Sequence, residues 1–161
     1  GKEMMATSSR RKSLEPSVFR IKSDEKSDTL LGSRCWNCHR VFFPQREWCA
    51  ACLEPTCKMI ELSREGTLLS FSLVEKKQAY SIVEAPYILG EVLLSEGPHI
   101  YTTMNLQSEV STEGVKLYST IGHDNLDLLK MGQKVVLKPI VVRKDEEGCD
   151  IVAYNFNLVE A

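Results

Sequence analysis

The chain has 161 residues, 43% of them hydrophobic and 26% charged, which is the composition of a soluble globular protein with one or two small domains. No apolar run approaches the roughly 18 residues that a membrane-spanning helix requires, so we expect no such helix and no membrane partner. Residues 1–40 carry nine lysines and arginines against five acidic residues, whereas residues 41–161 carry eleven against seventeen. This acidic second part is a poor match for a polyanion such as DNA or RNA.

The first 32 residues are polar and contain the basic run Arg10–Lys12. We expect a solvated tail here, with a short helix between Glu15 and Asp28. The segment has no apolar stretch of the kind found in a secretory signal peptide, and free cysteines suit a reducing compartment. We therefore expect a cytoplasmic protein.

Residues 33–57 contain two C-x-x-C pairs separated by ten residues: Cys35 with Cys38, and Cys49 with Cys52. Each pair presents two sulfurs to one side of an ion, and two pairs complete the tetrahedral four-thiolate site that is typical of structural zinc. A segment of about 25 residues cannot bury a core of its own, so the metal must hold it together. The spacing therefore predicts a rubredoxin-like zinc ribbon.

Two other metal groups fit parts of this pattern. The stretch from Cys35 to His39 also matches C-x-x-C-H, which attaches a c-type haem, but haem attachment needs export and has no use for a second cysteine pair. Four cysteines also bind iron in electron carriers, and visible colour would identify that case. We expect His39 to be a knuckle residue with positive φ, which histidine tolerates better than most residues. Cys57 and Cys149 remain as small hydrophobes with no assigned role.

From residue 58 onward the pattern becomes that of β-strands, with apolar and polar residues alternating. We expect five strands, at residues 66–75, 86–97, 99–106, 133–144 and 149–160. Pro139 within the fourth strand demands an edge or a bulge. A short helix is expected at residues 123–132, ending at Gly132.

Five strands with a helix between the third and the fourth is the order of an OB-fold. The predicted protein is therefore mainly β, with a zinc ribbon and a five-stranded OB-fold barrel after a short N-terminal helix or tail. The expected domains are residues 1–32, 33–57 and 58–161.

The loop between the first two barrel strands contains Lys76, Lys77 and Tyr80. Two cations and an aromatic ring can hold one small phosphorylated ligand, although a solvated hairpin tip is the simpler interpretation. The long segment from Gln107 to Asp124 contains several apolar residues, which either cover their own barrel or contact another chain. For the second case, we expect Leu117 and Tyr118 to bind the partner.

Catalytic motifs are absent from the sequence: it has no glycine-rich phosphate loop, no H-E-x-x-H and no nucleophile elbow. The histidines His39, His99 and His123 are scattered along the chain. A metal bound by four thiolates has no open coordination position. We expect no catalytic residue, and these features favour a binding or accessory module.

Several motifs follow one another in a specific order. After the two cysteine pairs, in which F-P-x-R begins at Phe43, come G-T-L-x-S-F from Gly66, A-P-Y from Ala85 and a closing Y-x-F from Tyr154. Together they resemble the acyl-CoA-associated zinc-ribbon/OB-fold family, long catalogued as a domain of unknown function. The resemblance runs from Leu31 to Phe156. The chain departs from the family at His39, where glycine is usual, and in the longer segment 107–123.

This resemblance implies a non-catalytic subunit that binds a thiolase-superfamily enzyme in a hetero-oligomer, stabilises it and helps to form its acyl-CoA site. Members of that family are partners of three kinds of enzyme: thiolases, hydroxymethylglutaryl-CoA synthases, and aldolases or hydratases that act on CoA thioesters. Some of the thiolases belong to anaerobic aromatic degradation. The expected cofactors are structural zinc and a CoA thioester shared with the partner. The alternatives are an aldolase or hydratase partner, and a stand-alone binder of nucleic acid or nucleotides.

Overall fold

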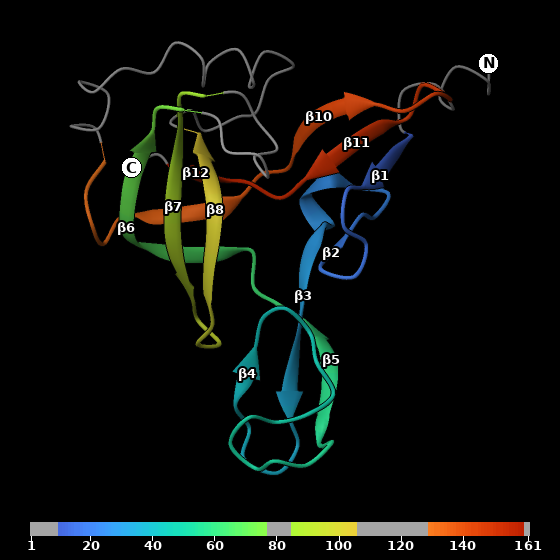
Figure 1. Cartoon of the computed structure of the whole chain (residues 1–161), viewed down its shortest axis with the longest axis vertical. Helices are drawn as coiled ribbons and strands as arrows, with labels where there is room; N and C mark the ends of the chain where they lie inside the picture. Colours follow the sequence, from blue (N-terminus) through green and yellow to red (C-terminus); the bar gives the residue numbers. More distant parts are fainter. Residues whose placement is uncertain (1–9, 77–84, 106–128, 160–161) are drawn as a thin grey trace.

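The structure is a computed structural model, and it describes residues 10–76, 85–105 and 129–159. Nearly all regular structure in these residues is β, as Figure 1 shows. The strands are β1 (Arg11–Ser13), β2 (Phe19–Arg20), β3 (Thr29–Cys35), β4 (Val41–Phe42), β5 (Cys57–Glu61), β6 (Glu65–Val74), β7 (Tyr87–Leu94), β8 (His99–Asn105), β9 (Lys134–Leu137), β10 (Ile140–Lys144), β11 (Asp150–Ala153) and β12 (Phe156–Leu158). A single 3₁₀ turn, η1 (Glu25–Ser27), precedes β3. No helix in the described ranges is long and apolar enough to cross a membrane.

Five strands close into a barrel in the order β12-β8-β7-β6-β9. Strand β12 pairs in parallel with β8 and antiparallel with β9, and β9 returns to β6. Read around the closed barrel from β6, the order is β6-β7-β8-β12-β9. These are the first, second, third, fifth and fourth predicted strands, which is the arrangement of an OB-fold. The predicted OB-fold barrel is confirmed.

Alternation along β7 and β8 separates the inside of the barrel from its outer face. Ile88 and Val92 are fully buried, and Ile100 on β8 lies opposite Val92. Leu89 and Tyr101 point outward and are 37% and 63% exposed. The outer face of these two strands is therefore available for contacts beyond the barrel.

Strand β6 departs from simple alternation. A register shift between Leu68 and Ser70 marks a β-bulge, which places two residues of β6 against one of β7. Leu68 is fully buried before the bulge, and Phe71 and Leu73 pack on the core after it. Strict alternation would put Leu68 and Phe71 on opposite faces, and the residue inserted at the bulge is what brings both to the core.

The fourth and fifth predicted strands each break in two. The fourth run stops at Lys138 and Pro139, and the fifth stops at Tyr154 and Asn155. In each case one half closes the barrel and the other half leaves it. The halves that leave, β10 and β11, pair with each other, and β1 adds to β11 in parallel. We call this sheet, β1-β11-β10, the arm.

The N-terminal region differs from the predicted helix. Between Glu15 and Asp28 the chain forms β2 and the turn η1 rather than a regular helix. The predicted helix at 123–132 lies mostly outside the described residues, and its described end is a turn with Gly132 at φ 91°. Within the described residues, Gly132 lies in a turn and is not preceded by a helix.

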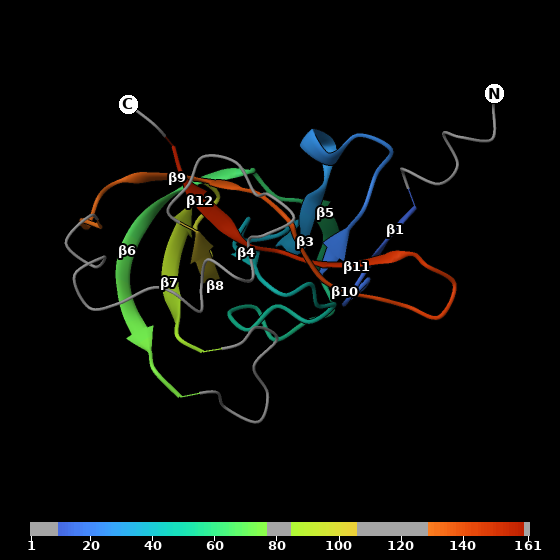
Figure 2. The ribbon, with the colours of Figure 1, turned by 90° about the horizontal axis from the view of Figure 1, so that it is seen from above.

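The cysteine ribbon is built on the long strand β3, which pairs with β2, β4 and β5. Figures 1 and 2 show the barrel and the arm side by side, and Figure 1 shows the ribbon projecting below both. The ribbon tip, where the knuckles lie, is thus well separated from the outer face of β7 and β8.

Two charged side chains join the N-terminal region, the ribbon strand and the barrel. The guanidinium of Arg64 donates to the carbonyl of Asp28 and, at 3.0 Å, to that of Leu137 in β9. The carboxylate of Asp28 is completely buried and accepts from Arg11 Nη1 at 2.6 Å and from the Lys22 N–H at 2.7 Å. The start of β3 is thereby fixed to both neighbours.

We predict that Asp28→Ala destabilises the fold by about 3–5 kcal/mol, because it leaves the mostly buried Arg11 guanidinium without its counter-charge and the Lys22 N–H without its acceptor. Lys144→Ala, which breaks the exposed pair with Asp150, is the control and should cost about 0–1 kcal/mol. Urea unfolding of both variants measures the difference. Equal losses would mean that the Asp28 contacts contribute no more than a surface ion pair.

Candidate metal centre and groove

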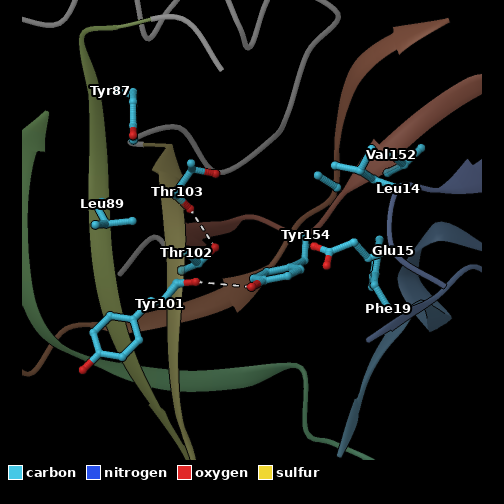
Figure 3. A pocket seen from close by; sticks show the side chains of 11 residues that line it. Leu14, Glu15, Phe19, Tyr87, Leu89, Tyr101, Thr102, Thr103, Val152 and Tyr154 are labelled. Atoms are coloured by element: carbon cyan, nitrogen blue, oxygen red, sulfur yellow. Dashed lines mark hydrogen bonds between the residues drawn. The ribbon is translucent and has the colours of Figure 1, made fainter. Parts of the chain in front are cut away.

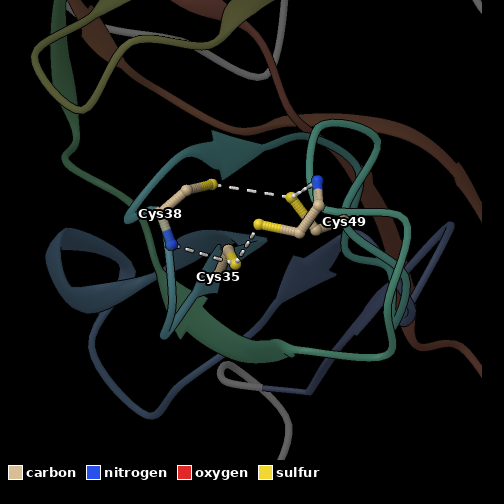
Figure 4. A group of neighbouring side chains, drawn as sticks. Cys35, Cys38 and Cys49 are labelled. Carbon is tan, nitrogen blue, oxygen red and sulfur yellow. Dashed lines mark hydrogen bonds between the residues drawn. The ribbon is translucent and has the colours of Figure 1, made fainter.

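Two knuckles bring four thiols together at the ribbon tip. The sulfurs of Cys35, Cys38, Cys49 and Cys52 all lie within 4.8 Å of one another. Figure 4 shows Cys35, Cys38 and Cys49 in this cluster. Cys35 Sγ is 3.8 Å from Cys52 Sγ, and Cys38 Sγ is 3.6 Å from Cys49 Sγ. A tetrahedral site with Zn–S distances of about 2.3 Å has sulfurs about 3.8 Å apart. The four thiols therefore have the spacing that a zinc ion requires.

Hydrogen bonds from the knuckle backbone favour the thiolates of Cys35 and Cys38. Burial raises the pKa of the Cys35 thiol, but the N–H groups of Cys38 and Asn37 and the hydroxyl of Thr56 outweigh it and lower that pKa to about 5. The Asn37 amide lowers the pKa of Cys52, but burial and the neighbouring sulfurs outweigh it and raise that pKa to about 11. Four thiolates so close together need a cation, which is the chemistry of a metal site.

The two knuckles repeat the same backbone geometry. The N–H of His39 donates to the Cys35 carbonyl at 2.9 Å, and the N–H of Leu53 donates to the Cys49 carbonyl at 2.8 Å. Both residues have positive φ, 67° for His39 and 58° for Leu53. The predicted conformation of His39 is confirmed, and histidine fits this knuckle position.

The fifth cysteine of the ribbon, Cys57, lies beside the cluster but outside the group of four. It is the cross-strand partner of Cys35, and only 8% of it is exposed. Burial, and then the charge of the neighbouring cysteines, raise the pKa of its thiol. Cys57 therefore behaves as a small buried hydrophobe next to the four clustered thiols.

A second group of possible ligands lies at the turn between β10 and β11, where Asp145, Glu147 and Cys149 come together. Lys12 Nζ already lies 2.9 Å from Asp145 Oδ2, and the backbone N–H groups of Glu147 and Cys149 donate to the other oxygen. The Lys12 ammonium is the main reason why the pKa of Asp145 falls to about 2. This group is a turn held by an ion pair rather than a metal site.

A groove of about 240 Å³ separates the outer face of the barrel from the arm (Figure 3). From the barrel it is lined by Tyr87, Leu89, Tyr101 and Thr103, and from the other side by Leu14, Glu15, Phe19, Val152 and Tyr154. The Tyr154 hydroxyl reaches across and donates to the Tyr101 carbonyl at 3.4 Å. The walls come from segments far apart in the sequence.

Tyr154 is held firmly at this position. Its ring makes edge contacts with Phe19 and Phe43, at centroid distances of 6.4 and 6.1 Å. Burial, and then the negative charge of Glu15, raise the pKa of its phenol. Tyr154 is therefore a neutral, fixed aromatic surface within the groove.

Next to the groove, the outer face of β6, β7 and β8 carries a polar cluster centred on Glu91. Its carboxylate accepts from the Ser70 hydroxyl at 2.9 Å and from the Tyr101 hydroxyl at 3.3 Å, and it lies 2.6 Å from His99 Nδ1. The hydrogen bond with His99, then that with Ser70, lowers the pKa of Glu91. Ser70 and His99 both bond to the carboxylate rather than to each other, so His99 does not activate the hydroxyl.

Of the residues predicted to contact CoA or the partner, the structure describes only one. Lys76 is exposed just after β6. Lys77, Tyr80, Leu117 and Tyr118 lie outside the described residues. The groove residues were missed because strand alternation predicts which residues point outward, but not which distant segments lie against them.

Comparison with known proteins places this architecture in a class, a cysteine ribbon joined to an OB-fold barrel. No protein-family model matches the chain. A solved structure described as the Ltp2-ChsH2(DUF35) aldolase is similar in fold, with a TM-score of 0.55, 21% identity and coverage of 81% of this chain and 84% of that one.

Curated relatives give the family. The benzoylsuccinyl-CoA thiolase subunit BbsA of Geobacter metallireducens is 31% identical over 89% of this chain and 84% of its own length. A DUF35 domain-containing scaffold protein of Methanothermobacter thermautotrophicus is 30% identical over 79% of this chain and 83% of its length. Another, from Methanocaldococcus jannaschii, is 38% identical, but the match spans only 51% of that relative and 44% of this chain. The chain belongs to the DUF35 family.

We predict one zinc ion per chain, bound by Cys35, Cys38, Cys49 and Cys52. Cys52→Ser should lose most of the zinc and lower the melting temperature, because metal binding supplies folding free energy to the ribbon. Cys57→Ser, a matched change of a cysteine beside the site, should keep one zinc. Elemental analysis after dialysis measures the metal. Iron with the visible absorbance of a four-thiolate iron centre, or no metal at all, would contradict this assignment.

Proposed function

We propose that this protein is a non-catalytic accessory subunit of a thiolase-superfamily enzyme that acts on CoA thioesters. It stabilises the enzyme and helps to form its acyl-CoA site. The observation that carries the proposal is the 31% identity, over most of both chains, to a protein named as a benzoylsuccinyl-CoA thiolase subunit. A thiolase acting on an aromatic acyl-CoA is accordingly the partner that we propose.

The chemistry of the described residues agrees with an accessory role. A four-thiolate metal has no open position for substrate, so the ion supports the ribbon rather than a reaction. Among the described residues, the one group containing serine, histidine and a carboxylate has the carboxylate between the other two. That arrangement supplies no activated nucleophile. The reacting groups are therefore assigned to the partner.

For the CoA moiety we propose contacts from the loop that begins at Lys76. Lys76 and Lys77 would pair with phosphates, and Tyr80 would lie near the adenine or the pantetheine chain. Leu117 and Tyr118 are proposed as contacts to the enzyme subunit.

Nucleic-acid binding is the weaker alternative. An OB-fold that binds single strands uses aromatic residues together with a basic groove that tracks the phosphates. The described residues that line the groove include three tyrosines but no lysine or arginine. With Glu15 in its wall and Glu91 beside it, this surface repels phosphates.

The function is tested by mixing the purified chain with the thiolase-superfamily enzyme of its host. We predict a stable hetero-oligomer by size-exclusion chromatography with light scattering, and full thiolysis of an aromatic 3-oxoacyl-CoA only when both are present. The chain alone should have no activity. Thiolysis by the chain alone, or failure of the two proteins to associate, would contradict the proposed function.

The CoA contacts are tested in that complex. We predict that Lys76→Ala combined with Lys77→Ala raises the Kd for CoA about tenfold, the factor that corresponds to the loss of about 1.4 kcal/mol of ionic contact. Lys144→Ala with Lys138→Ala removes the same charge elsewhere and should leave the Kd unchanged. Calorimetric titration of the complex with CoA measures this Kd. An unaltered Kd in the first variant would show that these lysines are solvated surface.

A further inference from the structure

The groove between the barrel and the arm has a distinctive chemical character. Its described lining combines the aromatic rings of Tyr87, Tyr101 and Tyr154 with aliphatic side chains, and it contains no basic residue. One charged group, the carboxylate of Glu15, points from its wall toward the Tyr154 ring (Figure 3). An aromatic surface with a carboxylate beside it favours a cation over an anion or a purely apolar group.

Both sides of the groove carry negative charge. On the barrel side, hydrogen bonds from His99 and Ser70 lower the pKa of Glu91, whose carboxylate also accepts from the Tyr101 hydroxyl. On the other side, no basic side chain of the described residues forms an ion pair with Glu15. The occupant that complements this surface therefore brings a positive charge to Glu15.

The size of the groove limits what it can hold. A cavity of about 150 Å³ accommodates a benzene molecule, and sites for whole drug-sized ligands occupy about 300–1,000 Å³. At about 240 Å³ the groove takes one large side chain, but not a complete CoA thioester. Its carboxylate also disfavours the CoA phosphates.

We propose that this groove is a docking site for an arginine side chain on the surface of the partner enzyme. The inference rests on the proposed function, because it assumes that such an enzyme binds. The guanidinium stacks on the Tyr154 ring, and its N–H groups donate to Glu15. Tyr101, whose hydroxyl is directed to Glu91, lines the barrel side of the groove. Arginine is preferred over lysine because its planar group both stacks on aromatic faces and donates in a fork to a carboxylate.

The site has an independent geometric rationale. In OB-folds, the face of the second and third strands is a common binding surface, and here those strands are β7 and β8. Exposed aromatic side chains such as Tyr101 are enriched among the residues that dominate interface energies. The arm converts this open face into a groove, so the partner contacts both the barrel and the arm.

The test uses the complex of the full chain with its thiolase-superfamily enzyme. We expect Glu15→Lys and Tyr101→Ala each to weaken the Kd about tenfold or more, and Glu15→Gln to weaken it less while reducing its dependence on salt. Glu146→Lys is the matched control, because Glu146 is an exposed carboxylate on the turn between β10 and β11. It should leave the Kd within about twofold. Melting temperatures of the free variants establish that each is folded.

The outcomes separate this inference from the proposed function. Failure of the wild-type chain to bind the enzyme overturns both. Binding that survives Glu15→Lys and Tyr101→Ala overturns only the groove, as does a Tyr101→Ala variant that binds normally but has a raised KM for the acyl-CoA. If Glu146→Lys weakens binding as much as Glu15→Lys, the loss reflects overall charge rather than the groove. That result would also overturn the groove proposal.

A second measurement needs no partner enzyme. We expect the dipeptide amide N-acetyl-Phe-Arg-NH₂ to shift the NMR signals of the Tyr101 and Tyr154 rings in the wild-type chain, and N-acetyl-Phe-Glu-NH₂ to shift them much less. Glu15→Lys should abolish the difference. Equal shifts from both peptides, or no shift from either, would contradict a site for arginine.

Discussion

A backbone hydrogen bond of 2.6 Å, from the N–H of Lys138 to the carbonyl of Asn155, joins the two points at which the C-terminal strands leave the barrel. Pro139 cannot donate to a ladder, so β9 ends there and β10 turns away. Directly opposite, β11 crosses back to become β12. This paired break produces the arm, and with it the groove, without opening the barrel.

Side chains at the break hold it in place. The Asn155 Oδ1 atom accepts from the Thr103 hydroxyl at 2.9 Å, and the Asn155 amide donates to Asn157 Oδ1 at 3.0 Å. All three residues are buried, so each bond is made in a low-dielectric interior where an unpaired polar group is costly. The position of Tyr154, one residue before Asn155, follows from this network. A structural constraint on the barrel thus orients the aromatic surface of the groove.

The ribbon and the groove are stabilised by different interactions. The ribbon tip is built around four clustered cysteines with the spacing of a metal site, and the ribbon is joined to the rest through Arg64, the start of β3 and the contact of Phe43 with Tyr154. The groove depends on hydrophobic packing and on the break at Asn155. Loss of the metal should therefore loosen the cysteine knuckles first, while the barrel stays folded.

Local signals in the sequence were enough to predict the cysteine cluster and the barrel. The four cysteines were visible because ligands of one knuckle are three residues apart, and the strands because alternation extends over neighbouring residues. The break at Tyr154 and Asn155 was not visible, because the run from Cys149 to Glu160 alternates through it. Neither was the parallel pairing of Arg11 with Asp150, since no short-range pattern links residues so far apart. The groove depends on both features, and for this reason it emerged only from the structure.

Hydrogen–deuterium exchange of the chain alone and in complex with its thiolase-superfamily enzyme tests the central claim most directly, that this is an accessory subunit which binds its enzyme through the groove. The account predicts added protection in β7, β8, β11 and the segment around Glu15, with little change in the cysteine knuckles at Cys35–Cys38 and Cys49–Cys52. Protection confined to the ribbon, or an exchange pattern that the enzyme leaves unchanged, would contradict it.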